Sequence, residues 1–137
     1  MKKLVFITLL FHLSRQSVAQ SQILGRWLSE DKKGITEIFQ QNERYYGKIV
    51  WVKPGKDVPI TDVENPDKSK RLQPLINLLI LKDFIYSGNE WKNGTVYDPA
   101  NGKTYTCTMK LLNHNTLRVR GYWGPFYRTD IWVKSKL

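Results

Sequence analysis

Cysteine and histidine are almost absent from this sequence. The chain has one cysteine, Cys107, so no intramolecular disulfide can form and stability must come from packing. Of the two histidines, only His114 lies beyond the N-terminal segment, between the turn-forming residues Asn113 and Asn115. These counts exclude a zinc cluster of cysteine and histidine ligands, and they exclude a serine or cysteine triad unless His114 is the base.

Other chemical signatures are also missing. No pair of carboxylates is marked out for acid and base catalysis, no glycine-rich loop could cradle a phosphate, and there is no internal repeat. We therefore expect no cofactor and no metal. An enzyme remains the least favoured function, with Asp98, Tyr105 or His114 as the groups that would exchange protons.

The sequence has no apolar run long enough to cross a membrane. The run from Leu4 to Leu13 has ten residues, whereas a spanning helix needs about 20. Lys2 and Lys3 precede this run, and Ser17 and Ala19 supply small residues before Gln20, which is the pattern of a cleaved signal peptide. We predict a signal peptide over residues 1–19 and a periplasmic or extracellular mature chain; an amphipathic first helix is the alternative.

Acidic residues are scarce beside basic ones. The chain has 22 Lys and Arg against 12 Asp and Glu, and loss of the predicted signal peptide lowers the formal charge from +10 to +7. A basic protein attracts anions and anionic surfaces, although a solvated surface explains the same excess. Arg118 and Arg120 share one face of a predicted strand and could form a strip that binds anions. Nucleic acid is not an expected partner of an exported protein.

The remaining sequence predicts antiparallel strands joined by turns in one domain, residues 20–137. The pattern is clearest over residues 104–112, where Tyr105, Cys107, Met109 and Leu111 share one face of the strand. Eight strands in so short a chain favour an all-β fold, an up-and-down barrel or a sandwich. The predicted strands are 23–28, 36–41, 45–52, 84–87, 91–97, 104–112, 116–123 and 127–134.

Residues 54–81 do not follow this pattern of short strands joined by turns. The first half of the segment is rich in proline and aspartate, and Asp67 or Ser69 could cap a short helical turn before Pro74. The second half, residues 75–81, is apolar. In a closed barrel we expect this segment to be a long connection that lies across one mouth as a lid.

Residues 98–103 read as a tight turn or as a metal-binding loop. Pro99 presets φ for a turn, and Gly102 supplies the positive φ that leads back into a strand. A calcium loop would have only Asp98 and Asn101 as side-chain ligands, and Lys103 would repel the ion. The hairpin is therefore the favoured interpretation.

The chain is rich in aromatic residues, with five Trp and seven Tyr. Aromatic side chains fill barrel cores, and they also line cavities that bind apolar ligands. We assign Trp27 and Trp132 to the core. The roles of Trp51, Tyr122 and Trp123 stay open between core and binding site, because each lies at a strand end before a loop that contains proline or glycine.

Short motifs occur along the chain in this order: Gly25-Arg26-Trp27, residues 46–51, Asn65-Pro66-Asp67, residues 72–76, residues 96–99, residues 102–105, residues 117–122 and Arg128-Thr129 ahead of Trp132. Taken together, these motifs resemble those of the bacterial domain of unknown function 2147, over nearly all of residues 23–134. Two departures stand out: Gln73 lies where family members often have arginine, and a cysteine pair found in many members is missing. The resemblance implies an exported protein and no particular reaction.

A more remote resemblance links the chain to lipocalins and the wider calycin group. The Gly-x-Trp motif at Gly25 and Trp27, with a late arginine, is similar to the pattern in which a tryptophan closes the barrel floor. This resemblance implies that Trp27 plugs the barrel, that Arg128 packs over its ring, and that the fold is an up-and-down, lipocalin-like barrel of about eight strands.

We therefore expect a barrel that binds a small apolar or amphipathic ligand, which could carry an anionic group. The alternative is an envelope protein whose basic outer face binds an anionic surface or a partner. The oligomeric state is not predicted. The residues expected at the ligand-binding mouth are Trp51, Tyr97, Asp98, Lys103, Tyr105, Arg120, Tyr122 and Trp123.

Overall fold

The structure is a computed structural model that describes residues 17–137. The predicted signal peptide falls mostly on residues 1–16, which lie outside the described residues. The first described element is a short helix, α1 (Val18–Gln22), and the predicted cleavage point after Ala19 falls within it. Within residues 17–137, no helix is long and apolar enough to cross a membrane.

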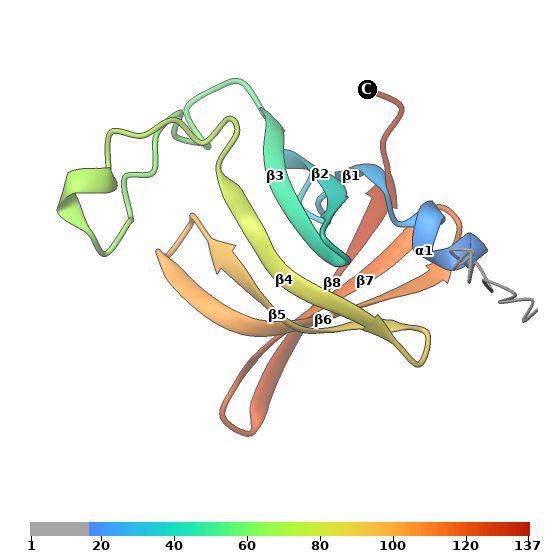
Figure 1. Cartoon of the computed structure of the whole chain (residues 1–137). Helices are drawn as coiled ribbons and strands as arrows, with labels where there is room; N and C mark the ends of the chain where they lie inside the picture. Colours follow the sequence, from blue (N-terminus) through green and yellow to red (C-terminus); the bar gives the residue numbers. More distant parts are fainter. Residues whose placement is uncertain (1–16) are drawn as a thin grey trace, which may run out of the picture.

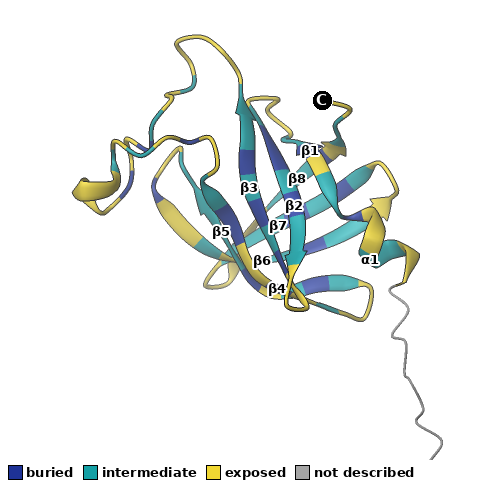
Figure 2. Cartoon of the chain, turned by 45° about the horizontal axis from the view of Figure 1, so that its top comes forward, coloured by how far each residue is buried: buried dark blue, intermediate teal, exposed yellow. Residues whose placement is uncertain are grey.

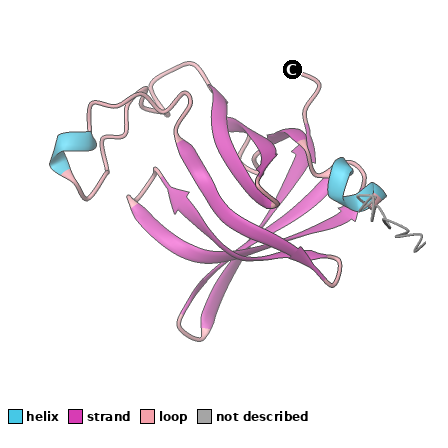
Figure 3. Cartoon of the chain, in the orientation of Figure 1, coloured by secondary structure: helices cyan, strands magenta, loops and turns pink. Residues whose placement is uncertain are grey.

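Eight antiparallel strands form a closed barrel in the order of the sequence (Figures 1 and 3). Each strand pairs with the next along the chain, and β1 closes the barrel by pairing with β8. The prediction of an all-β, up-and-down barrel is confirmed. The strands are β1 (Gly25–Leu28), β2 (Gly34–Gln41), β3 (Arg44–Val52), β4 (Leu79–Ser87), β5 (Glu90–Asp98), β6 (Lys103–Asn113), β7 (Thr116–Trp123) and β8 (Phe126–Lys134).

The predicted alternation decides which side chains face the interior. In β6, Cys107 and Met109 are buried, and they lie opposite Gly121 and Val119 of β7. Figure 2 shows the same change between buried and more exposed residues along other strands. The interior face therefore follows from the period of two in the sequence.

The start of β4 was predicted wrongly, at Phe84 in place of Leu79. Ile80 and Leu81 are adjacent and both buried, so the start of this strand does not alternate. Asp83 adopts a positive φ of 64° within the strand, and the β3–β4 register shifts nearby. In the sequence, the start of this strand is a continuous apolar run with no alternation, so the period of two did not mark it as a strand.

Large side chains fill the end of the barrel beside α1. Trp27 is fully buried, and its Nε1 donates to the carbonyl oxygen of Ile23, just after α1, at 2.8 Å. The role of Trp27 as a plug at this end is therefore supported by its position. Other fully buried residues in the core are Tyr45, Leu81, Phe84, Trp91, Met109 and Leu117.

The cation over Trp27 is Lys134, and the expectation that Arg128 covers the ring was wrong. Lys134 lies directly opposite Trp27 in the β1–β8 register, with its Nζ 4.6 Å from the ring centroid. The Nζ also donates to the carbonyl oxygens of Gln22 and Leu24 at 3.0 and 2.6 Å. Arg128 lies six residues earlier on β8, about 20 Å away at the rise of a strand.

The long connection between β3 and β4 includes the predicted helical turn, a 3₁₀ helix η1 (Lys68–Lys70). Asp67 caps this turn by accepting a hydrogen bond from the amide of Ser69 at 3.0 Å. The prediction of a lid was only partly right. Asp57, Val58 and Leu75 reach the barrel mouth, but the part of the connection with η1 projects away from the barrel (Figure 1).

Candidate functional site

A cavity of about 540 Å³ occupies the barrel end opposite α1. Its inner wall is mostly apolar, and its mouth reaches solvent between the loops that join β1 to β2, β3 to β4, β5 to β6 and β7 to β8. This size is within the usual range of pockets for small ligands. The residues of the inner wall are Gly34, Thr36, Ile49, Val52, Leu75, Ile80, Val96, Val119, Gly121 and Trp132.

The interior residues of this half include two glycines, which leave space among the larger side chains of the wall. A barrel of eight strands is just wide enough to be filled by side chains or to hold one small ligand. Trp27, Phe84 and Trp91 fill the half near α1, whereas Gly34 and Gly121 contribute no side chain to the other half. The sequence therefore places bulk at one end of the barrel and leaves the other end hollow.

The mouth carries more acidic than basic residues. We call its five acidic residues the mouth carboxylates: Glu30, Asp31, Asp57, Asp98 and Asp130. The cations that line the cavity are Lys33 and Arg128. The local balance is therefore opposite to that of the whole chain, whose formal charge is +10.

Asp130 belongs to the wall of the cavity as well as to its mouth. It lies opposite Val119 in the β7–β8 register, so both side chains are on the interior face. Its Oδ1 accepts a hydrogen bond from Nε of Arg128 at 3.3 Å. Burial raises the pKa of Asp130; Arg128 acts against this rise, and the nearby charges of Glu30 and Asp31 add to it.

Aromatic rings also border the mouth. Tyr105 and Trp123 both line the cavity, and their ring centroids are 5.8 Å apart. The Tyr105 hydroxyl accepts a hydrogen bond from the Asn101 side chain at 2.9 Å, and Trp123 packs against Phe126. The mouth thus offers apolar ring faces next to carboxylates.

Residues 98–103 form the hairpin turn that the sequence predicts. The amide of Gly102 donates to the carbonyl oxygen of Asp98 at 2.8 Å, and Gly102 has a φ of 72°. Side-chain oxygens of Asp98 and Asn101 accept from the amides of Ala100 and Lys103. These polar side chains therefore stabilise the turn, as expected.

Half of the residues predicted for the mouth line the cavity. Tyr97, Asp98, Tyr105 and Trp123 do so, whereas Trp51, Lys103, Arg120 and Tyr122 do not. These expectations therefore need correction for the second group, for the reasons that follow.

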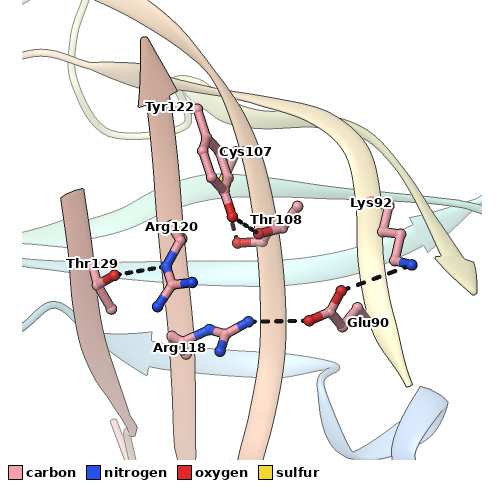
Figure 4. Close-up of polar contacts among 8 residues, drawn as sticks. All are labelled: Glu90, Lys92, Cys107, Thr108, Arg118, Arg120, Tyr122 and Thr129. Atoms are coloured by element: carbon pink, nitrogen blue, oxygen red, sulfur yellow. Dashed lines mark hydrogen bonds and ion pairs between the residues drawn. The ribbon is translucent and has the colours of Figure 1, made fainter. Parts of the chain in front are cut away.

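Arg120 and Tyr122 lie on the outer face, because they alternate with the interior residues Val119 and Gly121. Nε of Arg120 donates to Thr129 at 2.8 Å (Figure 4). The guanidinium of Arg120 also lies 4.5 Å from the Tyr127 ring centroid. The Tyr122 hydroxyl is 3.2 Å from the hydroxyl of Thr108 (Figure 4). Both side chains therefore have partners on the surface of the barrel.

The proposed strip of arginines is also occupied by partners from the chain itself. Arg118 forms an ion pair with Glu90 at 3.1 Å, and Glu90 contacts Lys92 as well (Figure 4). A guanidinium that already has a carboxylate partner is a weaker site for an external anion. The outer face is thus less suited to bind anions than its sequence indicated.

Trp51 lies away from the cavity because of an irregularity between β2 and β3. Ile35 pairs with Trp51 but Thr36 pairs with Ile49, so the register shifts by one residue at this point. Thr36 and Ile49 line the cavity, and Ile35 and Trp51 do not. A bulge of this kind changes the face on which a side chain lies.

Tyr97 connects the barrel to the long connection. Its hydroxyl donates to the fully buried carboxylate of Asp62 at 2.6 Å. Burial of the Tyr97 hydroxyl raises its pKa, and the hydrogen bond to Asp62 adds to the rise. The side chains of Asn65 and Gln73 donate to the other Asp62 oxygen at 2.8 and 3.1 Å. A second cavity, of about 340 Å³, lies beside this group.

Sequence reasoning missed Asp62 and the network around it. Asn65, Gln73 and Tyr97 all occur in the motifs that indicated the family, and the structure brings them to one carboxylate. A buried carboxylate is stable only when several hydrogen-bond donors surround it, and these three side chains supply the donors for Asp62.

Cys107 is a buried interior residue, as predicted, and we expect its thiol to be unreactive. Burial raises the pKa of Cys107 to about 12. At pH 8 the folded protein should react with Ellman's reagent at least about 100-fold more slowly than the protein in concentrated urea, because the thiolate is the reactive form. Complete labelling of the folded protein within minutes would contradict this assignment.

Comparisons with known proteins agree with the fold. A family model described as "Uncharacterized protein conserved in bacteria (DUF2147)" matches residues 25–134. A solved structure, HP1028 from the human pathogen Helicobacter pylori, is described as belonging to the lipocalin family. It is 21% identical, with a TM-score of 0.72 and 83% of each chain covered. No curated protein matches the chain.

Proposed function

The chain belongs to the DUF2147 family of uncharacterised bacterial proteins, and we propose that it is an exported, lipocalin-like protein that binds a small apolar or amphipathic ligand. The observation that carries this proposal is the cavity of about 540 Å³, with an apolar wall and an aromatic, polar mouth. Export follows from the predicted signal peptide. The similar fold of a protein described as belonging to the lipocalin family supports the proposal by analogy alone.

The cavity supports binding better than catalysis. Of the three groups named for proton exchange, Asp98 and Tyr105 line the cavity, where they accept hydrogen bonds from Ala100 and Asn101 of the hairpin. His114 lies in the turn between β6 and β7, at the other end of the barrel, and within residues 17–137 neither histidine nor cysteine lines the wall. The wall therefore offers apolar area and shape, and the mouth offers groups that can fix the orientation of a ligand.

A substitution at Gly121 should block the cavity and leave the fold intact. A Cβ at Gly121 would lie 3.5 Å from Cβ of Tyr105 and 3.6 Å from a methyl group of Val96, which are ordinary contacts. Gly121→Leu therefore places a leucine side chain in the cavity without a backbone clash. We expect binding of the neutral fluorescent probe N-phenyl-1-naphthylamine to weaken at least about tenfold.

The matched control is Thr106→Leu, which adds the same side chain to the exposed face of β6. Fluorescence titration should give the same affinity for this variant as for the unmodified protein, and circular dichroism should show that both variants are folded. Equal probe affinity in all three proteins would place the probe outside the barrel and overturn the proposal.

A further inference from the structure

The distribution of charge predicts the charge of the ligand. The mouth carboxylates make up five of the 12 acidic residues in the chain, while Lys33 and Arg128 are two of its 22 basic residues. The mouth of a basic protein therefore has a formal charge of −3. A cleft with low-dielectric walls focuses such a field on whatever enters it.

Two of the mouth carboxylates face the inside of the barrel. Asp130 lies opposite Val119, and Asp98 lies two residues after Val96 on β5, so each starts from the interior face of its strand. Oδ1 of Asp98 also accepts a hydrogen bond from the amide of Ala100 in the hairpin. Arg128, the ion-pair partner of Asp130, has a side chain that is 70% exposed. Its guanidinium is thus well solvated and neutralises the interior only in part.

The charged neighbours of Asp130 are more often negative than positive. Its ion-pair partner is Arg128. Burial is the main cause that raises the pKa of Asp130, and the negative charges of Glu30 and Asp31 add to the rise. Glu30 and Asp31 accept hydrogen bonds from the amides of Ile131 and Lys33. Three carboxylates around one exposed guanidinium leave an excess of negative charge at the inner edge of the mouth. A cation from a ligand would relieve this repulsion.

The aromatic rings at the mouth suit the same kind of ligand. Tyr105 and Trp123 line the cavity, with their centroids 5.8 Å apart. Indole and phenol faces attract ammonium groups, and they do so more strongly where water is partly excluded. The rings and the carboxylates therefore favour the same charge.

The residues expected to receive an anion are elsewhere. Arg120 lies on the outer face with Thr129 and Tyr127 as partners. Lys103 is the register partner of Asp98 at the end of the β5–β6 pair, but it does not line the cavity. The apolar wall defines the site, and the charges at its mouth select the head group of the ligand.

We propose that the ligand is a cationic amphiphile, an amine or quaternary ammonium on an apolar body, whose charged end lies between Asp98 and Asp130. This inference rests on the proposed function, since it concerns the head group of a ligand bound in the same cavity. The apolar body would lie against the wall formed by Val96, Val119 and Trp132.

Two fluorescent probes that differ in their end group test this inference. Dansylcadaverine ends in an ammonium, and 6-(dansylamino)hexanoic acid ends in a carboxylate after the same number of methylene groups. At low ionic strength and pH 7, dansylcadaverine should bind at least about tenfold more tightly. Equal affinities, or tighter binding of the acid, would overturn the inference.

Variants at the mouth locate the source of the preference. The double variant Asp98→Asn and Asp130→Asn keeps an oxygen acceptor at each position, and it should reduce the affinity ratio of the two probes at least about fivefold. Glu43→Gln, in the turn between β2 and β3 at the far end, makes a single charge change and should leave the ratio unchanged. A ratio that survives the double variant would also overturn the inference.

The neutral probe separates this inference from the proposed function. If N-phenyl-1-naphthylamine binds and is blocked by Gly121→Leu, but the charged probes bind equally, only the choice of head group fails. If the neutral probe does not enter the cavity, the proposed function fails as well.

Discussion

Replacing Trp27 with alanine should lower the free energy of unfolding by about 3 to 5 kcal/mol. The side chain is fully buried at the end of the barrel beside α1, and Lys134 lies over its ring. The substitution removes a fully buried indole from this end and leaves the carbonyl oxygen of Ile23 without its indole donor. Urea unfolding followed by circular dichroism measures the change without depending on tryptophan fluorescence.

The same substitution at Trp123 is the matched control. Trp123 is 49% exposed at the mouth, so Trp123→Ala should cost no more than about 1 kcal/mol. If Trp27→Ala does not fold, Trp27→Phe retains most of the buried area and should lose about 1 to 2 kcal/mol through the missing N–H. Equal midpoints for Trp27→Ala and Trp123→Ala would refute the role of Trp27 as the plug of the barrel.

Replacing Asp62 with alanine should release the long connection from the barrel. The Asp62 carboxylate accepts from Tyr97, Asn65 and Gln73, so its loss leaves three donors without this acceptor. We expect a loss of about 2 to 4 kcal/mol, together with faster cleavage by trypsin after Lys68, Lys70 or Arg71. Thermal unfolding and timed proteolysis measure the two effects.

Two control variants show whether the effects of Asp62→Ala come from the loss of its hydrogen bonds. Tyr97→Phe removes one donor and keeps the carboxylate, and it should cost about 1 kcal/mol. Asp57→Ala removes an exposed carboxylate from the same connection and should change neither stability nor cleavage. The anchoring role of Asp62 is wrong if Asp62→Ala and Asp57→Ala unfold and are cleaved alike.

The fold could be predicted because a period of two is a local property of the sequence. Residues 104–123 show it clearly, and the structure places Cys107, Met109 and Val119 inside as this pattern indicates. The first part of β4 escaped prediction because Asp83 and the register shift break the period there. Local pattern thus predicts regular strands and fails where the strand is irregular.

The candidate site could be predicted only in part, because it depends on register and on loops far apart in the sequence. The alternation that places Val119 inside also places Arg120 outside, so its exclusion from the cavity was already implied. The outward position of Trp51 depends on a bulge that leaves no mark in the sequence. The mouth carboxylates come from four separate segments, so net charge alone could not predict an acidic mouth.

The resemblance to lipocalins agrees with the buried position of Trp27 but named the wrong cation over its ring. The interior face of β8 carries charged residues at both ends, with Arg128 at the mouth and Lys134 opposite Trp27. The β1–β8 register decides which of these two cations contacts the indole ring. This register pairs the first strand of the barrel with the last, and the two are far apart in the sequence. No local pattern specifies it.

The central claim is that the hollow half of the barrel receives a ligand, and a crystal structure with bound N-phenyl-1-naphthylamine tests it most directly. We predict that the naphthyl ring lies among Val96, Val119, Gly121 and Trp132. A ring found instead on the exposed side chains of Ile60, Leu72 or Tyr127, with the interior closed by the barrel's own side chains, would contradict the claim.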